Sequence, residues 1–508
     1  MKNKFLLLIA AFALPLCMWA NNIRVKLNSY NPTTKQLNIS LAWDNSWHDG
    51  SGQFRDAAWL FVKYKDITNA EWQHATLGTP NGSGGSITAT IADTVNTPGV
   101  LFDVQAKKAG VTTGPVTGYM IRRQKSTSVA TQNNPEYAGV YNVGMSFNVA
   151  ITLPAGVTLA NPEFRVYALE MVDIPQGAFY AGDGSANSYV KTNTTTNAPL
   201  YLTSTSGGTG LSATTYFRGE PISVSSNYPN GVAEYFIMKY ELSNEAYCEF
   251  MNTLTRAQQN SLAESSSFTT ATTGIINDFN DFHSKFAASF TSLTDPAVFG
   301  CDANQNGIFN EANDGQNNGV IINYMRDAFA YLDWAGLRAM SGYEFEKACR
   351  GPLAPVAGEF AWGTTTFNNA IIDVDVFGPN EGSSLTVDGP MARAGTRNGA
   401  FAKPAGSTRL NSGGSYYGVM ELSNSGSEPH IGYGDSPVWN SWTAINGDGL
   451  VNADYATLEL AATSPDVSRL YEAFNNNRIY QNANTSLKTG LSQPIPIPTR
   501  QTIRGVIK

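Results

Sequence analysis

Side chains that carry oxygen recur at alternate positions in the segment DANQNGIFNEAND, residues 302–314. Calcium prefers oxygen ligands, and EF-hand and dockerin loops supply them at alternate positions, with a glycine at the sixth position where the loop turns sharply. Gly307 stands at that sixth position. In the order of such a loop, the predicted ligands are Asp302, Asn304, Asn306, Ile308 through its carbonyl, Asn310 and Asn313. Because Asn313 occupies the twelfth position, where a bidentate carboxylate is usual, we expect a calcium site of modest affinity; an Asn/Gly-rich turn without metal is the alternative.

The side chains most often used for nucleophilic and metal chemistry are few. Beyond the first 20 residues the cysteines are Cys248, Cys301 and Cys349, which allow one disulfide at most. Cys248 and Cys349 fall on the apolar sides of expected helices, so we predict inert thiols, because a reactive thiolate needs an accessible, electropositive setting. The histidines are His48, His74, His283 and His430, and no two of them stand four residues apart.

Other glycine-rich segments predict loops and turns. GGTGLSA, residues 207–213, lacks the following helix pattern of a dinucleotide site. NGDGLVNAD, residues 446–454, partly repeats the calcium pattern but has Ala444 at the first ligand position. No Ser/His/Asp order, nucleophile elbow or phosphate loop stands out. The sequence therefore predicts no catalytic and no cofactor-binding residues.

Two short helices are predicted in the stretch AFAYLDWAGLRAMSGYEFEKACRG, residues 328–351. Apolar residues recur at i, i+3, i+4 and i+7 from Met325 to Leu332, which places them on one helical face. Ser341 followed by Glu344 is the spacing of a capping box that begins a second helix, and Gly351 stands just past its end.

Length and charge limit the classes of protein. A chain of 508 residues predicts two domains, and its net charge of -8, with no basic run, excludes nucleic acid as an expected partner. The first 20 residues combine Lys2 and Lys4 with an apolar run that ends at Ala20, which is typical of a cleaved secretory signal rather than a transmembrane segment. We therefore expect export, with free secretion and attachment to the cell surface both open.

The chain after this signal predicts a β-sandwich at residues 21–168 and a second domain at residues 169–508. Short alternating runs such as QLNISLAW and SFNVAITL are separated by Gly, Pro and Asn turns, as in sandwich domains. We expect the tryptophans of this region to be core or edge aromatics, and sugar stacking is the alternative. They are Trp43, Trp47, Trp59 and Trp72.

From about Glu170 onward, four ordered blocks resemble the formylglycine-generating, sulfatase-modifying family. They are EMVDIPQGAFYAGD (170–183), AEYFIMKYELSNEAYCEFMNTL (233–254), the helical block at 324–351 and SYYGVMELSNSGSE (415–428). The resemblance implies an irregular α/β domain related to C-type lectins, so the expected fold is mainly β with α+β character. The whole chain also resembles a group of exported Bacteroidetes proteins that place a Trp-rich sandwich before such a domain.

The resemblance also states what chemistry to expect. Catalytic members hold copper between two cysteines near the C-terminal end, and a related branch binds iron through three histidines. No cysteine follows Cys349 here, and the histidines do not fit, so we expect neither copper nor iron. The family's calcium motif, usually GNVWE, has Asn424 and Ser425 in place of its Gly-Asn pair and retains Glu428.

The functional hypothesis is therefore an exported, noncatalytic binding or assembly protein whose partner is a glycan, a protein or another copy of itself. Candidate contact segments are VWNSW at 438–442 and FNNNRIYQNAN at 474–484. The alternative is a formylglycine-generating or nonheme-metal oxidase with a divergent active site, which leaves open whether the chain is an enzyme.

Overall fold

The computed structural model describes residues 23–508 apart from a number of loops. The longer segments that it does not describe are 48–54, 82–86, 125–140, 154–158, 204–215, 222–227, 277–285, 403–407, 432–444, 452–470 and 474–501. The expected signal segment, the GGTGLSA loop and both candidate contact segments lie outside the described residues. None of the helices in the described part of the chain is long and apolar enough to cross a membrane.

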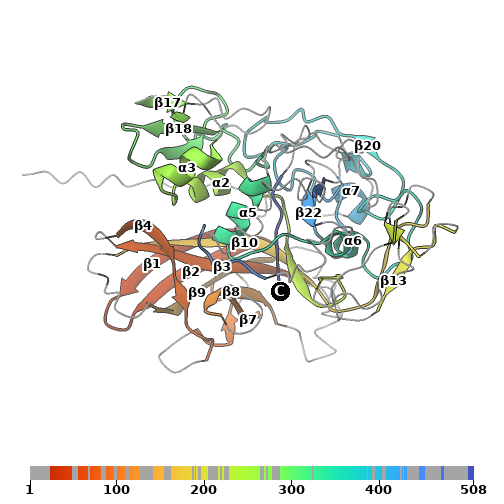
Figure 1. The fold of residues 1–508 in the computed structure, drawn as a ribbon, viewed down its shortest axis with the longest axis horizontal. Coiled ribbons are helices and arrows are strands. Elements are labelled where there is room, and N and C mark those ends of the chain that lie inside the picture. Colours follow the sequence, from red (N-terminus) through yellow and green to blue (C-terminus); the bar gives the residue numbers. More distant parts are fainter. Residues whose placement is uncertain are drawn as a thin grey trace, which may run out of the picture.

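The N-terminal region forms a sandwich of two antiparallel sheets (Figure 1). One sheet has the order β1 (Arg24–Asn31), β2 (Gln36–Ser46), β9 (Tyr141–Thr152) and β5 (Thr76–Leu77). The other has the order β24 (Val506–Ile507), β16 (Tyr235–Met238), β10 (Pro162–Ile174), β3 (Arg55–Asp66), β8 (Val116–Arg123), β7 (Leu101–Lys108) and β6 (Thr90–Ala92), with β4 (Asn69–His74) also paired to β3. The sandwich predicted from the alternating runs is present.

Strand β10 belongs to both halves of the molecule. It pairs with β3 of the sandwich over residues 162–173, and its last four residues, 171–174, also pair with β16. The C-terminal strand β24 then pairs with β16, so the end of the chain completes the same sheet. Ala168, where we expected the domain boundary, lies in the middle of β10. The two expected domains thus share one continuous sheet rather than meeting at a linker.

Strand β3 is buried on both of its faces. Alternate side chains point to opposite faces of a strand. Ala57, Trp59 and Phe61 pack in the core of the C-terminal half, whereas Leu60 and Val62 pack between the two sheets of the sandwich. The expected core tryptophans follow this division, because Trp43 lies in the core of the sandwich and Trp59 in the other core.

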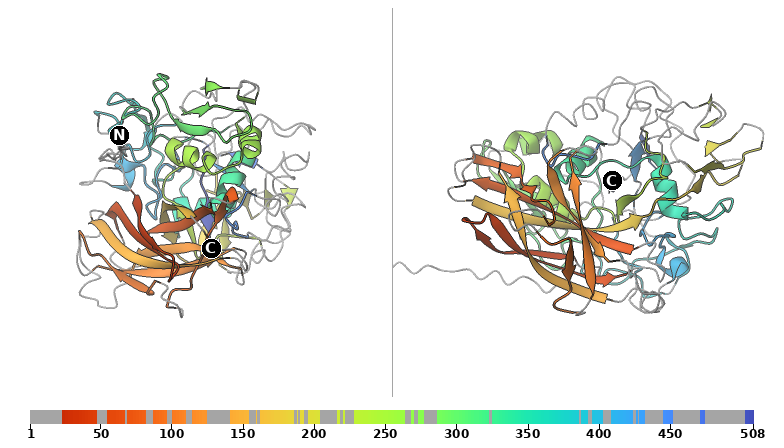
Figure 2. Two further views of the ribbon diagram at one scale, coloured as in Figure 1. Left: turned by 90° about the vertical axis from the view of Figure 1, so that its left-hand side faces the viewer. Right: turned by 90° about the horizontal axis from the view of Figure 1, so that it is seen from below.

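The C-terminal half is irregular and covers the outer face of the shared sheet (Figures 1 and 2). Its helices are α2 (Asn244–Met251), α3 (Arg256–Leu262), α5 (Met325–Trp334), α6 (Gly342–Arg350) and α7 (Arg409–Ser412). Its small sheets pair β11 (Phe179–Ala181) with β13 (Leu200–Leu202), β12 (Val190–Lys191) with β14 (Tyr216–Phe217) and β15 (Glu220–Pro221), β17 (Gly274–Ile276) with β18 (Phe286–Phe290) and β19 (Val298–Cys301), β20 (Asn368–Asn369) with β21 (Pro390–Met391), and β22 (Pro429–Ile431) with β23 (Tyr471–Ala473). The whole is mainly β with a few short helices, as the sequence predicted.

Helices α5 and α6 confirm the two helices predicted at residues 325–351. Phe329 and Leu332 of α5 are buried in the core, as their spacing required. The Ser341 hydroxyl accepts a hydrogen bond from the Glu344 amide at 3.1 Å, and the Glu344 carboxylate accepts one from the Ser341 amide at 2.9 Å. This reciprocal capping box starts α6, and Gly351 with φ of +65° ends it.

Buried ion pairs join the sandwich to the C-terminal half. Lys239, in the turn after β16, lies 3.2 Å from Glu170 of β10 and 3.9 Å from Asp56 of β3. Asp56 in turn accepts hydrogen bonds from the Trp43 indole at 3.1 Å and from the Ser46 hydroxyl at 3.0 Å. Since unpaired buried charges are costly, these contacts favour one relative position of the two halves.

Candidate functional site

The loop at residues 302–314, predicted to bind calcium, follows directly after β19. The two carboxylate oxygens of Asp302 accept backbone hydrogen bonds, Oδ1 from the Asn306 amide at 3.0 Å and Oδ2 from the Gly307 amide at 3.1 Å. Asn304 Oδ1 also accepts from the Asn306 amide, at 2.9 Å. Gly307 has φ of +80°, so the sixth position makes the left-handed turn for which glycine is suited. The structure thus brings the first three predicted ligands together around one tight turn.

The later predicted ligands are placed differently. Asn310 Oδ1 accepts a hydrogen bond from the Cys301 amide at 2.9 Å, so this side chain braces the end of β19. The Ile308 side chain is exposed, as a carbonyl ligand would allow, and Asn313 is also exposed. Asn310 is therefore engaged with the strand and would have to turn to reach a bound ion.

Two acidic residues that the sequence reasoning left out complete this loop. Glu311 Oε2 accepts hydrogen bonds from the side-chain amides of Asn304, at 3.2 Å, and Asn306, at 2.5 Å. Asp314 is fully buried and accepts from the Glu311 amide at 2.7 Å. They were missed because the tenth and thirteenth positions are not ligand positions in the pattern. Across the described residues, no three His, Cys, Asp or Glu side chains are grouped so that they could hold a metal ion, and the calcium site stays a prediction.

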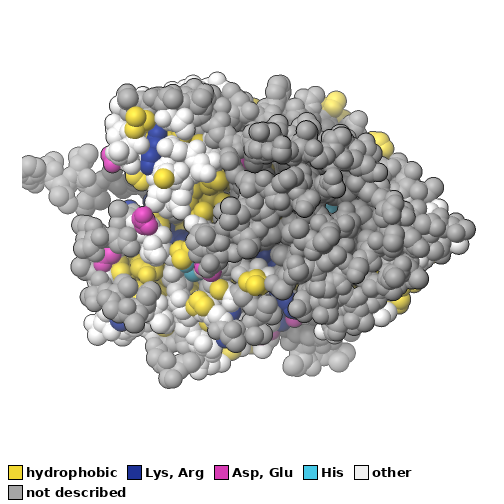
Figure 3. Space-filling model, viewed as in Figure 1, with side chains coloured by type: hydrophobic (Ala, Val, Ile, Leu, Met, Phe, Trp, Pro, Cys, Tyr) yellow, Lys and Arg dark blue, Asp and Glu magenta, His cyan; other side chains and the backbone are white. Residues whose placement is uncertain are grey.

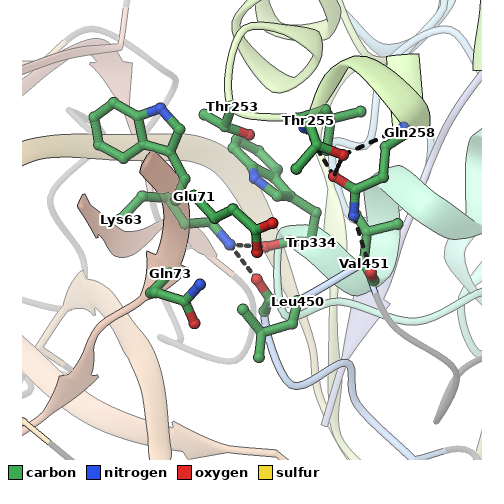
Figure 4. A pocket seen from close by; sticks show the side chains of 12 residues that line it. Lys63, Glu71, Gln73, Thr253, Thr255, Gln258, Trp334, Leu450 and Val451 are labelled. Carbon is green, nitrogen blue, oxygen red and sulfur yellow. Dashed lines mark hydrogen bonds between the residues drawn. The ribbon is translucent and has the colours of Figure 1, made fainter. Parts of the chain in front are cut away.

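A pocket lies where the sandwich meets the helices of the C-terminal half (Figure 4). This junction pocket has a volume of about 250 Å³. It is lined by Lys63 of β3, by Glu71, Trp72 and Gln73 of β4, by Thr253, Leu254, Thr255 and Gln258 around the start of α3, by Trp334 of α5 and by Gly449, Leu450 and Val451. Its size is below the range of about 300–1,000 Å³ common for drug-sized ligands, so it suits a small group such as one sugar ring or one side chain.

Lys63 forms the floor of this pocket and is itself buried. Its ammonium donates hydrogen bonds to the Trp334 carbonyl at 2.6 Å, to the Gly449 carbonyl and to His74 Nδ1 at 2.9 Å. His74 Nε2 donates to the Thr117 carbonyl at 2.6 Å, which leaves Nδ1 as the acceptor in a neutral imidazole. Burial lowers the pKa of Lys63 well below its usual value, while two nearby aspartates oppose this shift.

Lys63 contacts the C-terminal end of helix α5. Trp334 is the last residue of α5, and the carbonyls at a helix C-terminus lack partners within the helix. A cation is favoured at that end because the helix dipole is negative there. The lysine therefore links strand β3 to the end of α5, and its other two hydrogen bonds go to Gly449 and His74.

The walls of the junction pocket combine an aromatic face with amides and hydroxyls. Trp72 is half-buried and is stacked by Arg165 at 4.4 Å from its ring centroid and by Lys65 at 4.8 Å. On the opposite wall, Gln258 is held by a capping box with Thr255 and donates to the Val451 carbonyl at 3.3 Å. An aromatic side chain beside fixed polar groups suits a neutral ligand rich in hydroxyl or amide groups.

The described surface around this junction carries both apolar and charged side chains (Figure 3). Lys, Arg, Asp and Glu are scattered over this face, and they do not gather into a patch of one sign.

The partial second copy of the calcium pattern lies beside the junction pocket. Its described residues bend against the end of α5, where the Gly449 amide donates to the Asp333 carbonyl at 3.0 Å and the Asp448 amide donates to Asp333 Oδ1 at 3.2 Å. Asp448 Oδ1 accepts from the Leu450 amide at 2.8 Å. This segment forms a turn over its described residues, in line with its prediction.

The cysteines beyond the expected signal are all buried free thiols. Cys349, on α6, is completely buried, and burial raises the pKa of its thiol well above the usual value. Cys248 and Cys301 lie on α2 and β19. Of the histidines, His74 is hydrogen-bonded to Lys63, and His430 is buried beside Phe345, with ring centroids 6.2 Å apart. The other two histidines lie outside the described residues.

The model of the sulfatase-modifying factor enzyme 1-like domain matches residues 158–416, which is just over half of the chain. The chain belongs to the sulfatase-modifying factor family. The matched region begins before β10 and includes all of it, so the family domain itself supplies a central strand of the shared sheet. No curated protein matches the sequence significantly.

Glu428, the residue that the resemblance to the family's calcium motif singled out, lies beyond the matched region and has a protein partner. Arg504 Nε donates to Glu428 Oε1 at 2.9 Å, and its other two nitrogens donate to the Met238 carbonyl at 2.7 Å and the Met420 carbonyl at 2.9 Å. Burial raises the pKa of Glu428 to about 8, while Arg504 opposes the rise. Glu428 thus ties the block at 415–428 to the last strand, and Asn424 and Ser425 lie outside the described residues.

Sequence reasoning also missed the junction pocket, although one signal was present. Lys63 stands inside the otherwise apolar run AAWLFVKY, and a lysine is rarely buried unless it is paired. A charged residue within a strand that is buried on both faces indicates a polar contact inside the core. Its two carbonyl partners, on Trp334 and Gly449, could not be named, because they are more than 250 positions away.

Proposed function

We propose that this protein is an exported, noncatalytic binding or assembly protein built on the sulfatase-modifying factor domain. The observation that carries the proposal is the state of the cysteines. No cysteine follows Cys349, and this thiol is completely buried with a raised pKa, so it has neither the accessibility nor the thiolate character that copper binding and oxidation need. The sequence therefore keeps the family's scaffold without the thiol pair of its catalytic members.

The junction pocket is the binding site that we assign to this function. Its Trp72, Gln73 and Thr253 side chains offer apolar contact and hydrogen bonds. The ammonium of Lys63, the one cation of the floor, is already bound to protein acceptors, so it is held in place and not poised to attack a substrate. A pocket of this size and polarity favours a glycan residue or a polar side chain of a protein partner.

A glycan array and light scattering of the mature protein test this proposal together. We expect binding to one class of glycan or a defined oligomer, and we expect Trp72→Ala to weaken that binding at least tenfold. Tyr201→Ala removes an exposed aromatic side chain of β13, outside the pocket, and should leave binding unchanged. A monomer that binds nothing would contradict the proposal. Oxidation of a cysteine-containing peptide, lost in Cys349→Ser, would instead favour the divergent enzyme.

We further propose that the 302–314 loop binds calcium with modest affinity. Its support is the set of aligned Asp302, Asn304 and Asn306 side chains around Gly307, together with the nearby Glu311 carboxylate. Calcium would replace the bonds that the two asparagine amides now donate to Glu311, after rotation of their side chains. Calcium titration by calorimetry measures this directly, and heat no greater than that of buffer at millimolar calcium would exclude it.

A further inference from the structure

Cysteines Cys248 and Cys301 come from elements that are far apart in the sequence but packed together. Cys248 lies in the middle of α2, and Cys301 is the last residue of β19. Both are buried, with exposed fractions of 3% and 0%. Helix α2 packs against β19, and the Cys248 and Cys301 thiols lie near enough to interact. The fold therefore brings the two thiols close together.

Polar contacts to one side of this pair hold the end of α2 and the helix α3 against β19. Asn252, at the C-terminus of α2, donates from Nδ2 to the Phe299 carbonyl at 2.9 Å and accepts at Oδ1 from the Phe299 amide at 2.7 Å. Further along, Gln259 donates from Nε2 to the carbonyls of Met251 and Ala297, at 2.9 Å and 3.0 Å, and accepts at Oε1 from the Ala297 amide at 2.8 Å. The C-terminal end of α2 and the helix α3 are thus both held against β19 and the residue that precedes it.

The distance from the Asn252–Phe299 contact to each cysteine is similar on the two elements. Cys248 precedes Asn252 by four residues, about 6 Å along a helix, and Cys301 follows Phe299 by two residues, about 6.6 Å along a strand. Because the two steps have nearly the same length, Cys301 comes level with Cys248 where α2 packs along β19.

We infer that Cys248 and Cys301 are joined by a disulfide in the exported protein. The inference rests on the proposed export, because disulfides form and persist in oxidising compartments. The thiolate of one cysteine attacks a disulfide oxidant and forms a mixed disulfide with it, and the second cysteine then displaces the oxidant's remaining thiol. The pair loses two protons and two electrons, and the oxidant is reduced to two thiols. Since both sulfurs are buried in the fold, the exchange takes place during folding.

The bond would also anchor the 302–314 loop. The Asn310 amide donates to the Cys301 carbonyl at 2.8 Å, and the Cys301 amide donates back to Asn310 Oδ1. Cys301 is therefore the last residue of β19 and the one to which the loop is hydrogen-bonded. Oxidation ties this residue covalently to α2 and so to the core of the family domain.

The test is a count of free thiols, assigned by peptide mapping, in mature protein recovered from the exported fraction. Alkylation in denaturant without reductant should label Cys349 alone, and prior reduction should expose all three thiols. Cys248→Ser should give two labelled thiols, and Cys349→Ser none. A second arm treats the purified, reduced protein with oxidised glutathione during refolding.

The two arms separate this inference from the proposed export. Three labelled thiols in both arms, or a disulfide that includes Cys349, would overturn the pairing. A chain that stays inside the cell but forms the Cys248–Cys301 bond with glutathione would refute the export and leave the pairing supported. Exported protein with the mapped bond supports both.

Discussion

Replacing Lys63 by methionine tests whether the lysine stabilises the contact between the sandwich and the family domain. Methionine keeps most of the apolar stem but removes the ammonium group. The carbonyls of Trp334 and Gly449 and the Nδ1 atom of His74 would then be left in the core without their donor. Each buried acceptor that loses its partner costs about 1–3 kcal/mol, and the mutant regains part of this because it no longer buries a charge. We expect a loss of about 2–4 kcal/mol in the free energy of unfolding.

Urea denaturation followed by tryptophan fluorescence measures this loss, because Trp334 lies at the contact. The matched control is Lys65→Met, two residues along the same strand. Lys65 is partly exposed and pairs with the exposed Glu163 at 3.0 Å, so its replacement should cost less than about 1 kcal/mol. If Lys63→Met unfolds within about 0.5 kcal/mol of the wild type, or if the two variants lose equal stability, the assigned role of Lys63 is wrong.

Three further predictions concern the junction, the buried acids and the calcium loop. A Cβ added at Gly449, where φ is +90°, would lie 2.1 Å from the His74 ring, so Gly449→Ala should lower the free energy of unfolding by about 2–4 kcal/mol. The control is Gly177→Ala, whose added Cβ meets nothing within 4 Å, and it should be nearly neutral in the same urea denaturation. Burial, helped by Glu241, raises the pKa of Glu421 to about 8. The folded protein therefore holds this proton more tightly than the unfolded chain does. The wild type should lose stability relative to Glu421→Gln as the pH rises from about 4.5 to about 8. Urea midpoints that change with pH in the same way for the two proteins would contradict the raised pKa. Asn313→Asp restores a carboxylate at the twelfth loop position and should strengthen calcium binding several-fold in a calorimetric titration, and unchanged affinity would show that the loop register is wrong.

Features that depend on a few neighbouring residues could be read directly from the sequence. The capping box at Ser341 and Glu344 forms as its three-residue spacing predicts, and Gly351 ends the same helix. The turn at Gly307 forms for the same reason, since each of its hydrogen bonds joins residues no more than five positions apart. The ordered blocks indicated the family, and the family match confirms that reading, because the first three blocks, at 170–183, 233–254 and 324–351, lie within the matched region.

Only the tertiary structure decided which distant residues meet. The run AAWLFVKY predicted a strand, but its neighbours on both sides, and with them the shared sheet, follow from pairing with β8 and β10, strands about 60 and 100 residues further along the chain. The same holds for Lys63, whose acceptors come from two separate segments, and for Cys248 and Cys301, brought together by the packing of α2 on β19. A local pattern records which face of an element is apolar, but it does not record which other element will cover that face. Hydrophobic burial is not directional, so the partner is selected only when all the elements pack at once.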